Sequence, residues 1–237
     1  MKKEIAILIA AGKGERMRPL TLTRPKPLVA VHGKPMIETV IEGLVRRGVA
    51  HIYITVGYLS EQFEYLTEKY PNITLIPNPE YTVKNNISSI YAARKVMGEC
   101  DCFVCEADLY ISEPSIFDAK LDTSCYFGKF VTGYSADWLF DVNMDGRITR
   151  VGKGGTDQYN MCGVCYLTAK DARVVRDAVL AAYAGEDYEQ KYWDEIVDEN
   201  LDKIAMTVHP VPDTSIVEID TVAELKVIDK SYEDIEI

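Results

Sequence analysis

Residues 8–18 have the sequence Leu8-Ile9-Ala10-Ala11-Gly12-Lys13-Gly14-Glu15-Arg16-Met17-Arg18, and Arg24-Pro25-Lys26-Pro27-Leu28 follows shortly after. An apolar strand therefore leads into a glycine-rich turn and then into a run of cations. Glycines let backbone N–H groups approach an anion closely, and cations neutralise it. Positions 13–26 hold five basic residues and one acidic residue, although the whole chain has 26 Lys+Arg against 37 Asp+Glu. This contrast indicates a site for a nucleotide triphosphate.

The composition of the 237-residue chain excludes several classes of protein. A net charge of −11 argues against a nucleic-acid-binding surface. No apolar run approaches the roughly 20 residues that span a membrane. The apolar run at residues 5–11 is near the lower limit for a signal peptide, and the glycine-rich loop after it favours a buried strand instead. We therefore expect a cytoplasmic protein that binds neither nucleic acid nor membrane.

The six cysteines include the pair Cys162 and Cys165, whose C-x-x-C spacing occurs in zinc and redox sites. The remaining cysteines offer no convincing partner pair, because Cys102 and Cys105 lie within a hydrophobic strand-like run. We expect reduced, buried cysteines that act as small hydrophobic residues.

The first half of the chain alternates strands and helices, which predicts a parallel sheet with helices on both faces. The expected strands are 3–10, 51–57, 73–77 and 102–107. The expected helices are one along Met36–Val45 that ends at Gly48, one capped by Ser60, and one at about 88–97.

The second half predicts antiparallel strands and further helices. Asp145-Gly146 lies between two short alternating runs and signals a hairpin within 140–151. Further strands are expected at 123–132, 162–167, 204–209 and 215–219, and helices at 169–184, at 188–200 and after Thr221. We expect one mixed α/β domain over residues 1–237, with a Rossmann-like, doubly wound core. Residues 1–112 would mainly bind nucleotide, and residues 113–237 would mainly bind the acceptor.

Acidic residues at strand ends are candidates for a magnesium site. Asp108 follows the buried run 102–107, where open α/β sheets bind ligands. Glu218 and Asp220 alternate along a later strand, so both face one side of it. Mg²⁺ takes one or two carboxylates together with substrate phosphates, so Asp108 and Asp220 are its expected ligands. Glu218 is expected to meet a cationic group of the substrate.

Each of the two tryptophans abuts an aspartate, in Asp137-Trp138 and in Tyr192-Trp193-Asp194. Aromatic faces beside carboxylates can enclose a quaternary ammonium, although core packing explains aromatic residues equally well. A separate polar segment contains Asn85, Asn86 and Ser88, whose side chains can contact a base edge or cap a helix.

The glycine-rich loop has neither P-loop spacing nor the third glycine of a dinucleotide fingerprint. Its longer pattern, Ala-Ala-Gly-x-Gly-x-Arg followed by Pro-Lys, resembles the sugar-nucleotide pyrophosphorylase-like nucleotidyltransferases. In that superfamily the loop wraps the triphosphate, which implies nucleotide contacts for Ala10, Ala11, Gly12 and Gly14 and catalytic phosphate contacts for Arg16 and Lys26.

Other segments resemble, more narrowly, the bacterial CTP:phosphocholine cytidylyltransferases. They are Gly57-Tyr58, Asn85-Asn86, Trp138, Tyr192-Trp193-Asp194 and Glu218-Ile219-Asp220. The resemblance covers residues 4–226. It implies that Asp108 and Asp220 hold Mg²⁺, with Asp108 also catalytic, and that Tyr58, Asn85, Asn86 and Ser88 belong to the nucleotide site. It further implies that Trp138, Tyr192 and Glu218 surround trimethylammonium, with Asp194 as a further candidate. If 188–200 were one regular helix, Tyr192 and Asp194 would point to nearly opposite sides.

The expected reaction is transfer of CMP from CTP to phosphocholine, giving CDP-choline and pyrophosphate. Lys129 and Lys153 are both candidates to contact the acceptor phosphate. The nearest alternatives are a sugar 1-phosphate, aminoethylphosphonate or phosphoethanolamine as the acceptor. A sugar site would need hydrogen-bonding groups in place of aromatic and acidic ones. The alternative from another class is a non-catalytic nucleotide-sensing domain, which the presence of Arg16, Lys26, Asp108 and Asp220 together disfavours.

Overall fold

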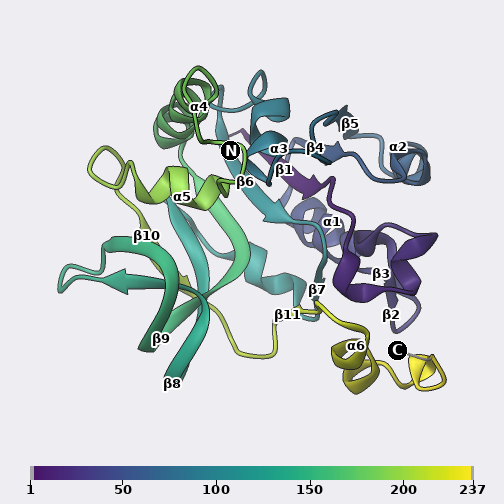
Figure 1. Cartoon of the computed structure of the whole chain (residues 1–237). Coiled ribbons are helices and arrows are strands. Elements are labelled where there is room, and N and C mark those ends of the chain that lie inside the picture. The colour runs from purple at the N-terminus through teal and green to yellow at the C-terminus, as the bar shows by residue number, and fades with distance from the viewer. Residues whose placement is uncertain (1–2, 236–237) are drawn as a thin grey trace.

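The computed structural model describes residues 3–235 and contains a seven-stranded central sheet. Four parallel strands form one half of it, in the order β5 (Ile73–Pro77), β4 (His51–Val56), β1 (Glu4–Ala10) and β6 (Asp101–Glu106). Beyond β6, the antiparallel strands β9 (Ile148–Leu167) and β8 (Cys125–Val142) follow, and β10 (Thr207–Pro210) pairs in parallel with β8 at the edge. This mostly parallel α/β sheet with inserted antiparallel strands confirms the predicted fold class (Figure 1).

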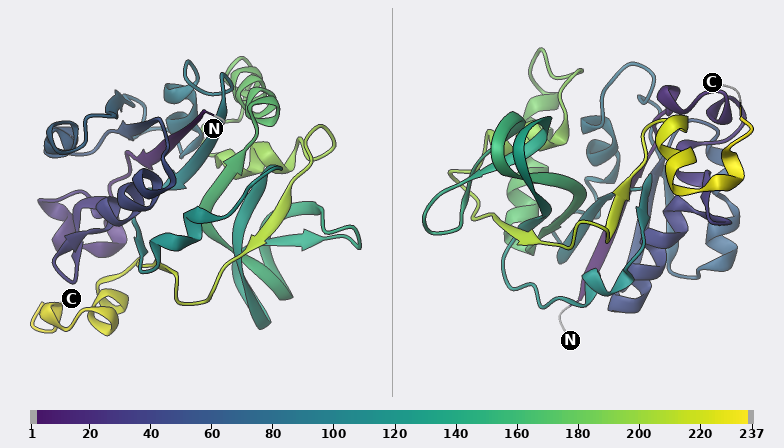
Figure 2. Two further views of the ribbon diagram at one scale, coloured as in Figure 1. Left: turned by 180° about the vertical axis from the view of Figure 1, so that it is seen from behind. Right: turned by 90° about the horizontal axis from the view of Figure 1, so that it is seen from below.

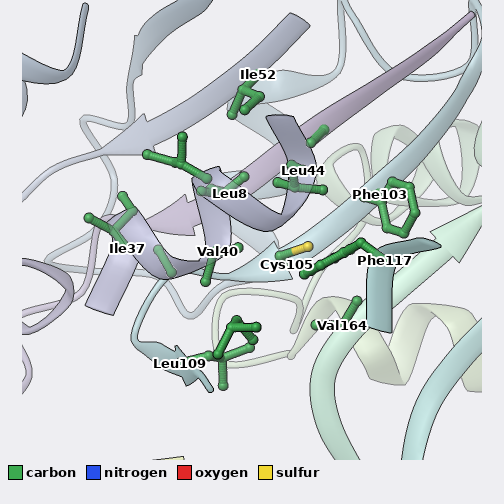
Figure 3. Close-up of a cluster of buried hydrophobic side chains, with 14 of the residues drawn as sticks. Leu8, Ile37, Val40, Leu44, Ile52, Phe103, Cys105, Leu109, Phe117 and Val164 are labelled. Carbon is green, nitrogen blue, oxygen red and sulfur yellow. The ribbon is translucent and has the colours of Figure 1, made fainter. Parts of the chain in front are cut away.

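Helices cover both faces of the sheet because successive residues of each strand point to opposite sides. Leu8 of β1 packs against helix α1 (Met36–Arg47), as Figure 3 shows, together with Phe103 and Phe117. Ile7, its neighbour in β1, packs in a second cluster on the other face. That face is covered by α3 (Ile87–Ala93), α4 (Ala169–Tyr183) and α5 (Trp193–Asp198).

Helix α1 ends where the sequence predicts, because Gly48 adopts a left-handed conformation with φ 83°. The helix expected after Ser60 is instead a short 3-10 turn, Ser60–Phe63, followed by α2 (Tyr65–Lys69). Phe63 and Leu66 are nevertheless buried, as expected from their spacing.

Strands β8 and β9 form one long antiparallel ribbon, although the sequence pattern indicates several separate strands. The turn at Asp145-Gly146 is confirmed, with φ 77° at Gly146. Repeated register shifts let each strand continue through irregular pairing. Figure 1 shows the ribbon curving away from the parallel half of the sheet.

The C-terminal segment returns to the first loop of the chain. Strand β11 (Ile216–Glu218) pairs with β7 (Leu109–Ile111), just after Asp108. Thr221 then caps α6 (Val222–Ile228) in a capping box with Glu224, as the sequence predicts. The views in Figure 2 place this segment beside the first loop, and a small apolar cluster joins the two, from Met17 to Ile219 and Leu225. This return places Asp220 next to Asp108.

None of the helices within residues 3–235 is long and apolar enough to cross a membrane.

Candidate active site

A cleft with two adjoining parts opens at the carboxyl ends of β1 and β6. One part, of about 360 Å³, is bounded by the glycine-rich loop and by residues 78–89. The other, of about 470 Å³, extends toward the β8–β9 ribbon. The two parts share Arg16, Glu106, Tyr192, Glu218 and Asp220. Their volumes suit small-molecule substrates, and their shared walls would bring two bound molecules into contact.

The glycine-rich loop lines the first part, as the sequence predicts, through Ala10, Ala11, Gly12, Gly14, Arg16 and Lys26. Gly14 has φ 62°, and a Cβ there would lie 2.6 Å from the Cβ of Lys26. Only glycine fits this conformation and this close approach without a shift of Lys26. The loop is thus folded so that its backbone and two of its cations face the same space.

Lys26 lies between the two predicted metal ligands. Its Nζ is 2.6 Å from Asp108 Oδ2 and 2.7 Å from Asp220 Oδ1, and the side chain is almost fully buried. Burial alone would lower the pKa of Lys26, but the two carboxylates raise it above its usual value. Arg16, which is largely exposed, is 2.9 Å from the same oxygen of Asp220. Two acids and two cations are therefore gathered at one point.

This arrangement fits a magnesium ion that is completed by substrate. Asp108 and Asp220 reach one common position, since both contact the same ammonium. Among residues 3–235, no group of three or more His, Cys, Asp or Glu side chains is arranged to hold a metal. Mg²⁺ commonly binds through one or two carboxylates, with phosphate oxygens and water as its other ligands. The donor set is therefore suitable for a metal that arrives with a nucleotide.

The polar wall of the first part is held together internally. Asn78 Nδ2 donates hydrogen bonds to Ser88 Oγ at 2.9 Å and to Ser89 Oγ at 3.2 Å. Ser88 Oγ in turn donates to the carbonyl of Asn85 at 2.8 Å. Asn85, Asn86 and Ser88 all line the cleft, as expected. The serine hydroxyl is engaged in fixing the wall, so its capacity to donate to a ligand is already used.

Tyr58, which we expect in the nucleotide site, is not among the residues that line the cleft. Its hydroxyl donates to the carbonyls of Thr21 at 2.8 Å and Leu22 at 3.2 Å. Tyr58 therefore anchors the segment between the glycines and Lys26. The ring beside the first part belongs to Tyr81, which packs where a Cβ of Gly57 would otherwise lie.

The second part contains a pair of aromatic rings with a lysine over both. The rings of Trp138 and Tyr192 meet edge to face, with centroids 5.4 Å apart. Lys153, which pairs with Trp138 across the ribbon, places Nζ 5.5 Å from each centroid. Lys129, the other candidate for the acceptor phosphate, hydrogen-bonds instead to the carbonyl of Ile216 and does not line the cleft. The position of Lys153 in the cleft therefore favours it over Lys129 as the residue that contacts the acceptor phosphate.

Glu218 lines both parts of the cleft. From the sequence, we expect its carboxylate to meet a cationic group of the substrate. Its enclosure by the cleft walls, together with the negative charges of Asp220 and Asp108, raises its pKa to about 7, even though the side chain stays open to solvent on one side. A bound cation would lower this pKa again by favouring the ionised carboxylate.

Asp194, a further candidate for the acceptor site, is not among the residues that line either part of the cleft. Helix α5 begins only at Trp193, so Tyr192 has an extended backbone and faces the cleft. Asp194, inside the helix, is buried and accepts a hydrogen bond from the Tyr126 hydroxyl at 2.9 Å. Burial raises the pKa of Asp194 to about 7, and the tyrosine opposes this shift only partly.

Lys84 and Glu106 also line the first part, and we predicted no role for either of them from the sequence. Lys84 donates to the Tyr188 hydroxyl at 2.8 Å, and its ammonium lies 4.4 Å from the ring centroid of Tyr183. Glu106, the last residue of β6, lines both parts. Burial and the nearby charges of Asp108, Glu218 and Asp194 raise the pKa of Glu106 well above its usual value. The sequence does contain an indication that Glu106 lines the cleft. Glu106 and Asp108 are two residues apart, so they share a side of the strand end.

The cysteines confirm the expectation of free, mostly buried thiols. All six are free, and only Cys100 is partly exposed. Burial raises the pKa of Cys162 to about 12, which leaves its thiol protonated and unreactive at neutral pH.

Comparison with known proteins agrees with this geometry. A family described as "Nucleotidyl transferase" matches residues 5–122. The 2-aminoethylphosphonate cytidylyltransferase of Lancefieldella rimae is 48% identical over 231 residues, which cover 98% of this chain and 94% of that protein. The chain belongs to the nucleotidyl transferase family. The choline-phosphate cytidylyltransferase of Streptococcus pneumoniae is 34% identical, over 93% of this chain and 95% of that protein.

A solved structure of CTP:phosphocholine cytidylyltransferase from Streptococcus pneumoniae has the same fold. It superimposes with a TM-score of 0.88 at 32% identity, over 97% of this chain and 99% of that one. These full-length similarities identify this member of the nucleotidyl transferase family as a cytidylyltransferase. The predicted family is confirmed. The residues of the cleft are the evidence that bears on which acceptor the enzyme uses.

Proposed function

We propose that this cytidylyltransferase transfers CMP from CTP to 2-aminoethylphosphonate, with Mg²⁺, and releases pyrophosphate. The observation that carries this proposal is the position of Lys153, whose ammonium lies 5.5 Å from the centroids of both Trp138 and Tyr192. The space over these rings, where a trimethylammonium group would be expected, is thus next to a cation of the chain itself. The 48% identity to a 2-aminoethylphosphonate cytidylyltransferase supports the same acceptor.

In this arrangement Lys153 attracts the acceptor's phosphonate, and the acids on the opposite wall attract its amine. A phosphonate dianion is complementary to the Lys153 ammonium. A primary ammonium carries N–H groups that can donate to Glu218, whereas trimethylammonium has none. The small acceptor would then lie across the second part of the cleft, between Lys153 and Glu218.

The reaction needs charge neutralisation and alignment more than it needs a base. A phosphonate oxygen, already ionised near neutral pH, forms a bond to the α-phosphorus of CTP as the bond from that phosphorus to the bridging oxygen of pyrophosphate breaks. Arg16 and Lys26 stabilise the charge that develops on pyrophosphate. Asp108 and Asp220 would hold Mg²⁺, which when bound neutralises phosphate charge and orients the triphosphate.

Phosphocholine is the second candidate acceptor. The paired rings of Trp138 and Tyr192 beside Glu218 are suited to a quaternary ammonium once Lys153 moves aside. Choline-phosphate cytidylyltransferases at 34% and 32% identity support this alternative.

The two acceptors can be told apart by product analysis. Purified enzyme is incubated with CTP, Mg²⁺ and equal concentrations of 2-aminoethylphosphonate and phosphocholine, and the products are resolved by ³¹P NMR. We expect the mixed phosphonate–phosphate anhydride as the main product. A predominance of CDP-choline would overturn it. Repeating the experiment with Lys153→Met should shift the products toward CDP-choline, because the competing cation is removed from the rings.

A further inference from the structure

Glu106 occupies the junction between the two parts of the cleft, at the carboxyl end of β6. It is paired in register with Ile9 of β1, so the central strands fix its backbone. Among residues 3–235, none hydrogen-bonds to its carboxylate or forms an ion pair with it. Its carboxylate is therefore free to accept a hydrogen bond from a ligand in the cleft.

The neighbouring backbone leaves room for this carboxylate. Gly163 of β9 has φ 67°, and a Cβ there would lie 2.7 Å from Glu106 Oε2. Any other residue would push the carboxylate away, in addition to straining the backbone. The glycine thus forms one side of a cradle in which the Glu106 carboxylate faces the cleft.

The cations of the cleft are engaged elsewhere. Lys26 contacts Asp108 and Asp220, Arg16 contacts Asp220, and Lys153 lies over the aromatic rings. Asp194, behind Glu106, is already bonded to Tyr126. None of these cations forms an ion pair with Glu106, so its carboxylate is available to a positively charged group of a bound molecule.

A metal ion is not the favoured partner. No trio of acidic, histidine or cysteine side chains within residues 3–235 is placed to bind one metal, so Glu106 is not the third ligand of a metal site with Asp108 and Asp220. Glu106 lines both parts of the cleft and lies against Gly163, whereas the two aspartates form ion pairs with Lys26.

We propose that Glu106 accepts a hydrogen bond from the primary ammonium of the acceptor and thereby selects amines over quaternary ammonium groups. This inference rests on the proposed function and assigns it a specificity-determining residue. A carboxylate within hydrogen-bond distance needs an N–H donor, and three methyl groups on nitrogen would hold the charge farther away and leave the oxygens unbonded.

The test compares two isosteric variants at pH 8. Glu106→Gln removes the charge at the cleft, and Glu99→Gln removes the same charge from an exposed position just before the other end of β6. For each protein, kcat/KM is measured with 2-aminoethylphosphonate and with phosphocholine, and the Kd of CTP is measured by calorimetry. Glu106→Gln should lower kcat/KM for the amine about 100-fold and that for phosphocholine less than fivefold. Glu99→Gln should change neither.

The wild-type arm tests the proposed function separately, since it shows which acceptor is preferred. If wild type prefers phosphocholine, the proposed function fails, yet a selective loss of amine turnover in Glu106→Gln would still support the role of Glu106. Equal losses for the two acceptors, or a matching loss of CTP affinity, would overturn this role. Should Glu106→Gln fail to fold, Glu106→Asp, which keeps the charge and withdraws it by one methylene, should show the same selectivity to a smaller degree.

Discussion

The side-chain oxygen of Asn86 accepts a hydrogen bond of 2.9 Å from the backbone N–H of Trp193. Its neighbour Asn85 is bound to the same segment twice, from its backbone N–H to the carbonyl of Glu189 at 2.7 Å and from Nδ2 to the carbonyl of Gln190 at 3.1 Å. The wall of the first part of the cleft therefore holds the segment that carries Tyr192. These hydrogen bonds connect the wall of the first part of the cleft to Tyr192, which also lines the second part.

This connection predicts that Asn86 acts on the acceptor through Tyr192. Asn86→Ala removes the acceptor of the Trp193 N–H and loosens the start of α5. We expect the KM of the phosphonate acceptor to rise about tenfold, with a smaller change for CTP. Steady-state kinetics with each substrate varied in turn measures both values. A larger effect on CTP would instead indicate that the Asn86 side chain contacts the nucleotide directly.

Lys26 should be essential for turnover because it neutralises two acids and faces the triphosphate site. Lys26→Met keeps the length of the side chain but leaves Asp108 and Asp220 without their buried cation. We expect kcat to fall by about 10²- to 10³-fold, as for the loss of one charge-stabilising donor. Lys13→Met removes the same charge from an exposed position in the same loop and should retain most activity. Comparable losses in the two variants would contradict a specific role for Lys26.

The residues of the first loop show how much of the site could be predicted from the sequence. Gly14, Lys26 and Asp108 were predicted at one site, because the carboxyl ends of parallel strands meet at one edge of a sheet. Asp220 could be assigned from its alternation with Glu218, although nothing local to it shows that β11 pairs beside Asp108. In each case the chemistry was encoded by local spacing.

The features of the site that could not be predicted from the sequence depend on contacts between residues that are far apart in the chain. Nothing in the 188–200 pattern shows that Asn85 and Asn86 hold residues 189–193, which leaves Tyr192 outside the helix and Asp194 within it. The cross-strand register that places Lys153 over Trp138 likewise depends on the bulges of the β8–β9 ribbon. These contacts between distant residues determine the acceptor side of the cleft.

Trp138 should affect the acceptor far more than the nucleotide. It lines only the second part of the cleft, where its ring contacts Tyr192. Trp138→Ala is therefore expected to raise the acceptor KM at least tenfold and to leave the KM of CTP within twofold. Initial-rate measurements of pyrophosphate release give both constants, and equal changes in the two would argue against an aromatic acceptor site.

Asp194 should make stability depend on pH. Its pKa is about 7 in the folded protein against an ordinary value of 3.8, so the folded state binds more protons between these values. The free energy of unfolding must then decrease as pH rises from about 4 to about 7, by about 4 kcal/mol at most. Asp194→Asn keeps an acceptor for the Tyr126 hydroxyl and should weaken this decrease. Urea unfolding at pH 5 and pH 8 measures it.

The matched control for this effect is Glu199→Gln. Glu199 follows α5 and pairs with Lys191 near the surface, so its loss should leave the pH dependence as in wild type. An Asp194→Asn protein with the same difference in stability between pH 5 and pH 8 as wild type would show that this buried carboxyl is not the titrating group.

The central claim is that this nucleotidyl transferase uses CTP to activate a small aminophosphonate. The ratio of kcat/KM for 2-aminoethylphosphonate to kcat/KM for phosphocholine, measured with wild-type enzyme, CTP and Mg²⁺, tests it most directly. We predict a ratio well above ten, because Lys153 would attract the phosphonate and the carboxylates of the cleft would accept hydrogen bonds from the primary amine. A ratio below one would contradict it.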